Sequence, residues 1–134
     1  MQVVYAVEPD LSARAFRDIL IASTLAERRP VNDQVRLERM LRQADIIVTA
    51  RHGDRLVGVA RAITDFAYCC YLSDLAVDVA YQRQGIGKRL IDETRARAGE
   101  CATLILIAAP AAQTYYPKIG MQQATSCWLI QRLG

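Results

Sequence analysis

The segment that decides the fold is Leu75-Ala76-Val77-Asp78-Val79-Ala80-Tyr81-Gln82-Arg83-Gln84-Gly85-Ile86-Gly87-Lys88. Leu75, Val77 and Val79 alternate with other residues, which is typical of a β-strand. Gly85 and Gly87 follow a short polar loop and open a stretch with helical periodicity. The segment therefore predicts a strand that runs through a loop directly into a helix.

Two glycines in the first turn of a helix require a physical reason, because each costs about 1 kcal/mol relative to alanine. The N-terminus of a helix has unpaired N–H groups and a partial positive charge, which together attract anions. Without Cβ atoms, a pyrophosphate can approach that main chain closely. The spacing lacks the GxxxxGK loop and the third glycine of the dinucleotide fingerprint. A phosphate-binding helix start is one interpretation, and a loop that simply needs flexibility is the other.

Outward from this segment, periodicity and turn residues divide the chain into further elements. We expect strands at residues 3–7, 45–50, 55–63, 68–79, 103–108 and 121–133. We expect helices from residue 13 until Pro30, from the N-cap Asn32 through residue 44, and at residues 85–98 and 111–119. The order β-α-α-β-β-β-α-β-α-β predicts an α/β (α+β) domain with a mixed, mostly antiparallel central sheet flanked by helices.

The strand expected at residues 103–108 is apolar on both faces, which favours a central position in the sheet. The whole chain, residues 1–134, fits one domain, because its length leaves no room for a second core.

Composition narrows the classes of function. Apolar residues make up 52% of the chain, which is enough for a substantial core. The net charge of +3 is scattered, so we expect no nucleic-acid partner, although it helps to attract an anionic cofactor. The start of the chain does not resemble a signal peptide, and no apolar run approaches the roughly 20 residues of a membrane span. We expect a soluble, cytoplasmic protein without a membrane partner.

The four cysteines, Cys69, Cys70, Cys101 and Cys127, lie in apolar runs and show no CxxC spacing. His52 has no companion ligand and lies in an expected hairpin turn. Reduced, buried thiols are therefore favoured over a disulfide or a metal site, and we expect no metal.

Two blocks of sequence resemble a known family. Residues 82–87 match the pattern Gln/Arg-x-x-Gly-x-Gly/Ala of the GNAT superfamily of acyl-CoA-dependent N-acyltransferases. Residues 75–77 resemble the strand that contacts pantetheine in that family, and residues 112–121 resemble its A-x-x-F-Y-E-K-L-G-F segment. The resemblance covers nearly the whole chain and implies acetyl-CoA as co-substrate.

The resemblance also implies which residues bind that co-substrate. The main chain of the loop and helix start would hold the CoA pyrophosphate, through Gln82, Arg83, Gln84, Gly85, Ile86, Gly87 and Lys88. Main-chain groups of Leu75, Ala76 and Val77 would contact the pantetheine arm and the thioester. The side chains of these three residues would in either case pack in the core.

Tyr116 occupies the position of the family's general acid. A phenol there can protonate the departing thiolate when an amine attacks the thioester. Plain packing is the alternative for Tyr116, and packing is the expected role of its neighbour Tyr115.

The chain departs from the family at two places. Ala109-Pro110 stands where many relatives have an asparagine, and residues 104–108 lack the glutamate that often serves as general base. Asp74, Ser73 or a chain of water molecules would then take the proton from the amine. Asp74 is equally interpretable as a structural carboxylate.

The function implied is transfer of an acetyl group from acetyl-CoA to a primary amine of a small molecule or a peptide, by direct attack in a ternary complex. A covalent route through Cys69 or Cys70 lacks a neighbouring histidine to activate the thiol. A non-catalytic acyl-CoA-binding or sensor module is the alternative function. The edge of a last strand often pairs two copies, so a homodimer is a further option that the sequence leaves open.

Overall fold

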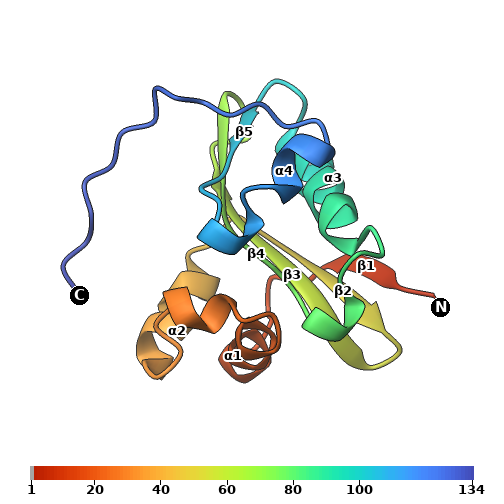
Figure 1. Cartoon of the computed structure of the whole chain (residues 1–134). Coiled ribbons are helices and arrows are strands. Elements are labelled where there is room, and N and C mark those ends of the chain that lie inside the picture. The colour runs from red at the N-terminus through yellow and green to blue at the C-terminus, as the bar shows by residue number, and fades with distance from the viewer. Residues whose placement is uncertain (1) are drawn as a thin grey trace.

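The computed structural model describes residues 2–134 and contains an open five-stranded sheet with helices on both faces (Figure 1). The strands are β1 (Val4–Val7), β2 (Ile46–His52), β3 (Arg55–Thr64), β4 (Cys69–Val77) and β5 (Thr103–Ile105). The α-helices are α1 (Ala13–Ala22), α2 (Gln34–Arg42), α3 (Ile86–Ala98) and α4 (Tyr115–Lys118). Short 3₁₀ turns lie at η1 (Leu25–Arg28), η2 (Val79–Tyr81) and η3 (Pro110–Ala112). The expected fold class, a mixed and mostly antiparallel sheet flanked by helices, is confirmed.

The strands lie in the order β1-β2-β3-β4-β5, and only the β4–β5 pair is parallel. Helix α3 makes the crossover between these two strands, as a parallel connection requires. The two strands pair over three positions only, from Cys69 opposite Thr103 to Tyr71 opposite Ile105. Beyond Tyr71, β4 continues without β5 beside it, so the sheet opens at this point.

Each face of the sheet carries its own apolar core. In β2, Ile46 and Val48 belong to the core under α3, while Ile47 belongs to the core under α1 and α2. This alternation follows from the two-residue period of a strand. Figure 1 shows α1 and α2 together on one side of the sheet and α3 with α4 on the other. The sheet is thus the middle of three layers.

Polar caps set the boundaries of the first two helices. The Ser12 hydroxyl accepts a bond from the main chain of Ala15 (3.1 Å) at the start of α1. Helix α1 ends at Ala22 and not at Pro30, because Thr24 turns into the left-handed region with φ 72°. Helix α2 is capped by Asp33 and not by Asn32, since it is the Asp33 carboxylate that accepts the bond from Arg36 N.

The C-terminal quarter of the chain differs most from expectation. Strand β5 has three residues and forms an edge of the sheet, so the expected central strand at residues 103–108 is wrong in length and position. The helix expected at residues 111–119 is divided between η3 and α4. Residues 121–133 form no strand at all. A strand needs a partner for its main-chain hydrogen bonds, and the apolar pattern of one segment does not reveal whether that partner exists.

Three of the four cysteines are exposed, although the sequence analysis expected buried thiols. All four are free thiols, but Cys69, Cys101 and Cys127 are exposed and only Cys70 is buried. Cys69 and Cys70 are neighbours in β4 and therefore point to opposite faces.

Within residues 2–134, no helix has the length and apolar character needed to cross a membrane. The same residues contain no group of three His, Cys, Asp or Glu side chains arranged to hold a metal ion.

Candidate functional site

The loop between β4 and α3 is held in shape by short polar contacts. The Asp78 carboxylate accepts a bond from Ala80 N (2.9 Å) and pairs with the Arg55 guanidinium (2.8 Å). The Gln82 side-chain amide donates to the Val77 carbonyl (3.1 Å) and so ties the loop back to the end of β4. The loop that the sequence assigned to phosphate binding is therefore a defined turn.

Helix α3 begins without a capping side chain. Its N-cap is Gly85 at φ 81°, a left-handed conformation that glycine adopts without strain. The first helical bond runs from Arg89 N to the Gly85 carbonyl (3.1 Å), so the N–H groups of Ile86, Gly87 and Lys88 have no acceptor within the helix. Helices α1 and α2, by contrast, each have a side-chain cap.

Burial orients the start of α3. The Ile86 side chain is buried in the core, while Gly85 is exposed and Gly87 is half-buried. The Ile86 side chain thus fixes the first turn of α3 to the core, while Gly85 and Lys88 lie at the surface. N–H groups without an acceptor inside the helix, at the positive end of a thirteen-residue helix, favour an anionic or oxygen acceptor.

The phenol of Tyr115 lies on this same turn. Its hydroxyl is 2.8 Å from the point that a Cβ atom on Gly87 would occupy. Burial raises the pKa of Tyr115, and the main-chain N–H of Lys88 opposes that rise. The sequence had assigned Tyr115 to packing, and only its place beside Tyr116 hinted at more. The Tyr115 hydroxyl therefore occupies part of the space over the main chain of the first turn, where it meets the Lys88 N–H.

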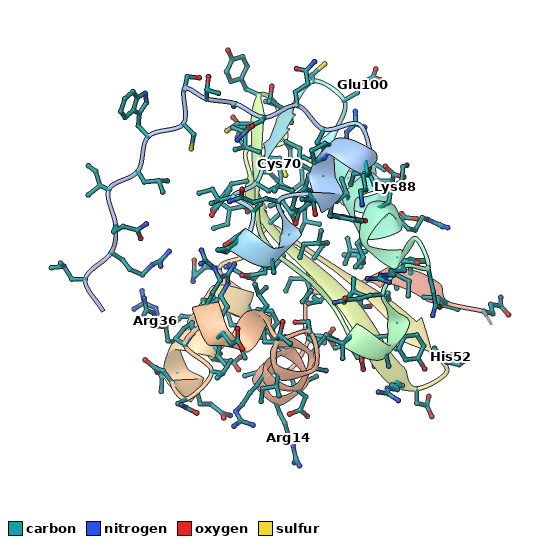
Figure 2. The ribbon with its side chains drawn as sticks, viewed as in Figure 1. Arg14, Arg36, His52, Cys70, Lys88 and Glu100 are labelled. Atoms are coloured by element: carbon teal, nitrogen blue, oxygen red, sulfur yellow. The ribbon has the colours of Figure 1, made fainter. Side chains whose placement is uncertain are left out.

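The charged side chains of α3 are turned along the helix. Lys88 pairs with Asp92 (2.8 Å) and Arg89 pairs with Glu93 (2.9 Å), four residues further on in each case. Figure 2 labels Lys88 on the first turns of α3. The ammonium group of Lys88 therefore already has a partner in Asp92, and its main-chain N–H meets the Tyr115 hydroxyl.

The open edge of β4 lies next to this helix start. Asp78 N donates to the Val57 carbonyl (2.9 Å), and Gly58 stands opposite Val77. In an antiparallel ladder this pattern marks Gly58 and Val77 as a pair without direct hydrogen bonds. The N–H and C=O of Val77 consequently point away from β3, where the C=O already accepts the bond from the Gln82 amide.

The same alternation gives the direction of the main-chain N–H and C=O groups of the two preceding residues. Leu75 points its main-chain groups into the opening, as Val77 does, whereas Ala76 faces Val59 within the β3–β4 ladder. The N–H and C=O of Leu75 and the N–H of Val77 thus face away from β3, on the side where an extended ligand would lie. Ala76 keeps only its packing role, because β3 already uses its main chain.

Tyr116 lies on α4 and packs against the core under α3. Its ring stands edge-on to Tyr115, with centroids 5.3 Å apart and an interplanar angle of 72°. Burial, and secondly the proximity of Tyr115, raise the pKa of Tyr116 above 10. The phenol therefore carries its proton throughout the neutral range, which a proton donor requires.

Asp74 is completely buried and lies between two guanidinium groups. Arg29 bonds to one carboxylate oxygen and Arg61 to the other. Arg29 also donates to the Ser73 carbonyl (2.8 Å), and Arg61 donates to the Ser73 hydroxyl (3.0 Å). With both oxygens engaged, the geometry favours the structural role for Asp74. The sequence did not reveal these partners, which lie 45 and 13 residues away along the chain.

Fold and site together define an α/β domain in which a glycine opens the helix α3 beside two parallel strands that part. Residues 14–126 match the model of the family described as "Acetyltransferase (GNAT) domain". The chain belongs to this family, and the resemblance stated from the sequence is confirmed. Membership fits an acyltransferase, and the family generally uses acetyl-CoA.

Solved structures of the same fold come from several bacteria. A GNAT-family acetyltransferase from Streptococcus pneumoniae is 22% identical, with a TM-score of 0.77 over 98% of this chain and 100% of that one. A probable acetyltransferase from meticillin-resistant Staphylococcus aureus is 21% identical, with a TM-score of 0.79 over 99% of both chains. An aminoglycoside acetyltransferase from a soil metagenome, solved with sisomicin, is 21% identical, with a TM-score of 0.67 over 98% of this chain and 96% of that one.

A curated relative matches over a shorter stretch. Histone acetyltransferase TAP1 of Glycine max is 49% identical over 39 residues, which are 29% of this chain. The match covers 17% of that relative's length. It supports the family and carries no further statement about the acceptor.

Proposed function

We propose that this chain is an N-acetyltransferase that transfers the acetyl group of acetyl-CoA to a primary amine of a small molecule or a peptide, within a ternary complex. The observation that carries the proposal is the uncapped start of α3 beside the open edge of β4. One element offers N–H groups to a diphosphate, and the other offers main-chain groups to an extended amide-containing arm. Coenzyme A contains both a diphosphate and an extended arm with amide groups.

The binding roles follow from the main chain. N–H groups of the loop and first turn hold the diphosphate, with Gln82 fixing the loop, through residues Arg83, Gln84, Gly85, Ile86, Gly87 and Lys88. Leu75 pairs with the arm through its N–H and C=O and Val77 through its N–H, since β3 does not use these groups and Gln82 bonds to the Val77 carbonyl. Bound acetyl-CoA supplies the activated thioester. The protein's part is to hold that thioester at a fixed place, which lowers the entropic cost of the encounter with the amine.

Tyr116 then serves as the proton donor. The amine nitrogen forms a bond to the acetyl carbon, the carbon–sulfur bond breaks, and the departing sulfur takes the phenolic proton. The proton released by the amine passes to water and restores the phenol. Water has this role because the oxygens of Asp74 and the hydroxyl of Ser73 already bond to arginines.

A second candidate is an acyl-CoA-binding module without catalysis. The ion pairs of Asp74 with Arg29 and Arg61 favour this candidate, because a carboxylate held by two arginines is no longer free to act as the general base that the sequence suggested. Tyr116 favours the enzyme, because its phenol occupies the position of the family's general acid. Both candidates use the same diphosphate-binding site at the start of α3, so they differ only in turnover.

The test combines binding with turnover. Acetyl-CoA should raise the unfolding temperature, and free thiol should appear when acetyl-CoA and a panel of primary amines are added. Binding without thiol release for any amine would support the module. No stabilisation by acetyl-CoA, even at millimolar concentration, would overturn both candidates.

Gly85→Glu and Gly85→Ala make a matched pair of variants that tests whether the diphosphate binds at the start of α3. Both strain the position equally, because its φ is 81°, and only glutamate adds bulk and negative charge. Gly85→Glu should abolish stabilisation by acetyl-CoA, while Gly85→Ala should retain part of it at a similar unfolding temperature. If the two variants bind acetyl-CoA equally, the diphosphate binds somewhere other than the start of α3.

A further inference from the structure

Three apolar side chains lie side by side across three strands of the sheet. Ile63 in β3 stands opposite Tyr71 in β4, and Tyr71 stands opposite Ile105 in β5. The exposed fractions of these residues are 47%, 39% and 48%. Residues directly opposite one another on neighbouring strands share a face of the sheet. The three side chains therefore form one apolar surface, which we call the apolar row.

The apolar row lies on the face of the sheet that α1 and α2 cover elsewhere. Cys70 and Leu72 flank Tyr71 and belong to the core under α3, so Tyr71 points to the opposite face. Arg61 lies two residues before Ile63 on that same face, and its guanidinium donates to a main-chain carbonyl of α2 (3.2 Å). Figure 1 shows β5 at the end of the sheet away from α1 and α2. These two helices therefore leave the apolar row exposed.

The charged cluster around Asp74 shares this face and has an excess of positive charge. The guanidinium groups of Arg29 and Arg61 share the single carboxylate of Asp74. The side chains of Asp74 and Arg61 are 0% and 7% exposed, whereas that of Arg29 is 21% exposed. Solvent thus reaches this cluster mainly through Arg29. An added anion would balance the second positive charge, and Arg29 is the group that it can approach.

The Arg29 guanidinium keeps donors for such an anion. Its Nε bonds to the Asp74 carboxylate, its Nη2 to the Ser73 carbonyl (2.8 Å) and its Nη1 to the Arg28 carbonyl (2.8 Å). Each Nη atom of a guanidinium carries two N–H groups. Among residues 2–134, one N–H on each Nη atom therefore has no acceptor. Charge-assisted bonds from guanidinium to carboxylate are among the stronger hydrogen bonds in proteins.

Arg29 reaches β4 at the place where the sheet opens. Strand β5 accompanies β4 as far as Tyr71, and the proposed site for the arm of acetyl-CoA begins at Leu75. Ser73 lies between these two residues and has no partner in the β3–β4 ladder, because the register shifts there. Since Arg29 bonds to the Ser73 carbonyl, its guanidinium lies between the apolar row and the proposed site of the thioester.

We propose that the acceptor is a primary amine that carries a carboxylate and an apolar side chain, which is the chemistry of a free apolar amino acid. Its carboxylate binds the Arg29 guanidinium, its side chain lies on the apolar row, and its amine faces the thioester beside Leu75. Charge complementarity favours this class over polyamines and aminoglycosides, which would bring further positive charge to the cluster. The inference rests on the proposed function, because it names the acceptor of that same reaction.

A comparison of two amines tests the role of the carboxylate. Phenylalanine and phenethylamine share a ring and a primary amine, and only phenylalanine has a carboxylate. With acetyl-CoA, kcat/KM for thiol release should be at least about tenfold higher for phenylalanine, because only phenylalanine pairs with Arg29. Arg29→Gln should remove most of this preference, while Arg29→Lys, which keeps the charge beside Asp74, should retain part of it. Equal values for the two amines in the wild type would overturn the proposal and leave acetyl transfer intact.

Tyr71→Ala and Tyr68→Ala make a matched pair of variants that tests the apolar row. Tyr68 is 80% exposed and precedes β4, outside the row. Glycine serves as the second amine, because it keeps the carboxylate and lacks a side chain. Tyr71→Ala should lower kcat/KM at least about tenfold more for phenylalanine than for glycine, since the acceptor's ring loses its aromatic contact. Tyr68→Ala should keep the wild-type preference. Equal losses for phenylalanine and glycine in Tyr71→Ala would contradict the proposal.

Calorimetry in the presence of CoA separates this proposal from the proposed activity. Phenylalanine should bind to the CoA complex of the wild type, and at least about tenfold more weakly to that of Arg29→Gln. Binding without thiol release would support the acceptor site and contradict acetyl transfer. Thiol release with other amines, but neither binding nor release with phenylalanine, would overturn this proposal alone.

Sedimentation tests the other possible occupant of the apolar row, a second copy of the chain. Tyr71→Ala should leave the mass in solution unchanged. A changed mass with an unchanged preference for phenylalanine over glycine would show that the row is an interface between copies, and the proposal would be wrong.

Discussion

The hydroxyl of Tyr115 lies 2.8 Å from the point where a Cβ atom on Gly87 would stand. Residue 87 is therefore a glycine for two compatible reasons. It makes room for the phenol on the first turn of α3, and under the proposed function it lets a diphosphate reach the same main chain when the phenol moves aside. The tyrosine and the proposed diphosphate share one surface.

Gly87→Ala should separate these roles. Alanine favours the helix by up to about 1 kcal/mol, and the end of the tyrosine side chain can shift, so the unfolding temperature should change little. Acetyl-CoA should bind at least about tenfold more weakly, a change of about 1.4 kcal/mol, because the new methyl group occupies the approach to the main chain. Calorimetry measures this change, with Tyr115→Phe as a control that should bind within about threefold of wild type. Unchanged affinity in Gly87→Ala would show that nothing approaches this turn closely.

Tyr116→Phe should lower kcat by roughly tenfold or more and leave the Kd for acetyl-CoA nearly unchanged, because it removes the proton donor and keeps the ring. The raised pKa of Tyr116 also places the loss of its proton above pH 10. Deprotonation of this group should therefore not slow the wild-type enzyme below that pH. Steady-state rates across pH check both points, and wild-type kcat in the variant would remove Tyr116 from the mechanism.

Asp74→Asn should destabilise the protein by about 3 to 5 kcal/mol, because it leaves two guanidinium groups without their shared carboxylate. The control is Asp92→Asn in the exposed pair with Lys88, which should change the free energy of unfolding by less than about 1 kcal/mol. Urea unfolding measures both. A variant at position 74 that keeps its stability but loses its activity would restore the catalytic interpretation.

Glu8 makes a pH-dependent contribution to stability. The Arg51 guanidinium bonds to both its oxygens (2.8 and 2.9 Å) and lowers the pKa of Glu8 below its ordinary value of 4.5; the Thr49 hydroxyl adds to the effect. The carboxylate therefore stabilises the fold above about pH 4.5. This contribution is lost as the pH falls through the lower pKa of the folded state.

Glu8→Gln should accordingly be less stable than wild type at pH 7, and the difference should shrink below about pH 4.5. Chemical unfolding at several pH values measures it. Glu38→Gln, in a more exposed pair with Arg42, is the control and should show little difference. A gap between wild type and Glu8→Gln that persists at acidic pH would contradict the assignment.

Local patterns carried most of what could be predicted. The strand, loop and helix of residues 75–88 follow from alternation, a polar turn and two glycines, all of which act over a few residues. The uncapped start of α3 is a property of the same short segment. Its function could be proposed before the structure was known because neighbours along the chain create it.

Contacts between distant residues could not be predicted in this way. Nothing near Asp74 in the sequence identifies Arg29 as its partner, and nothing near Gly87 identifies Tyr115. The C-terminal segment shows the same limit most clearly. The apolar pattern of residues 121–133 predicted a strand, but these residues have no neighbouring strand in the structure and form none.

The parting of β4 and β5 beyond Tyr71 has an energetic consequence for ligand entry. No interstrand ladder has to be broken before an arm is inserted at Leu75 and Val77, since only water must leave. This edge of β4 is thus already unpaired in the structure, so insertion of the proposed arm costs no hydrogen bonds between strands. Whatever free energy the ligand gains on binding should appear in full as added resistance to unfolding.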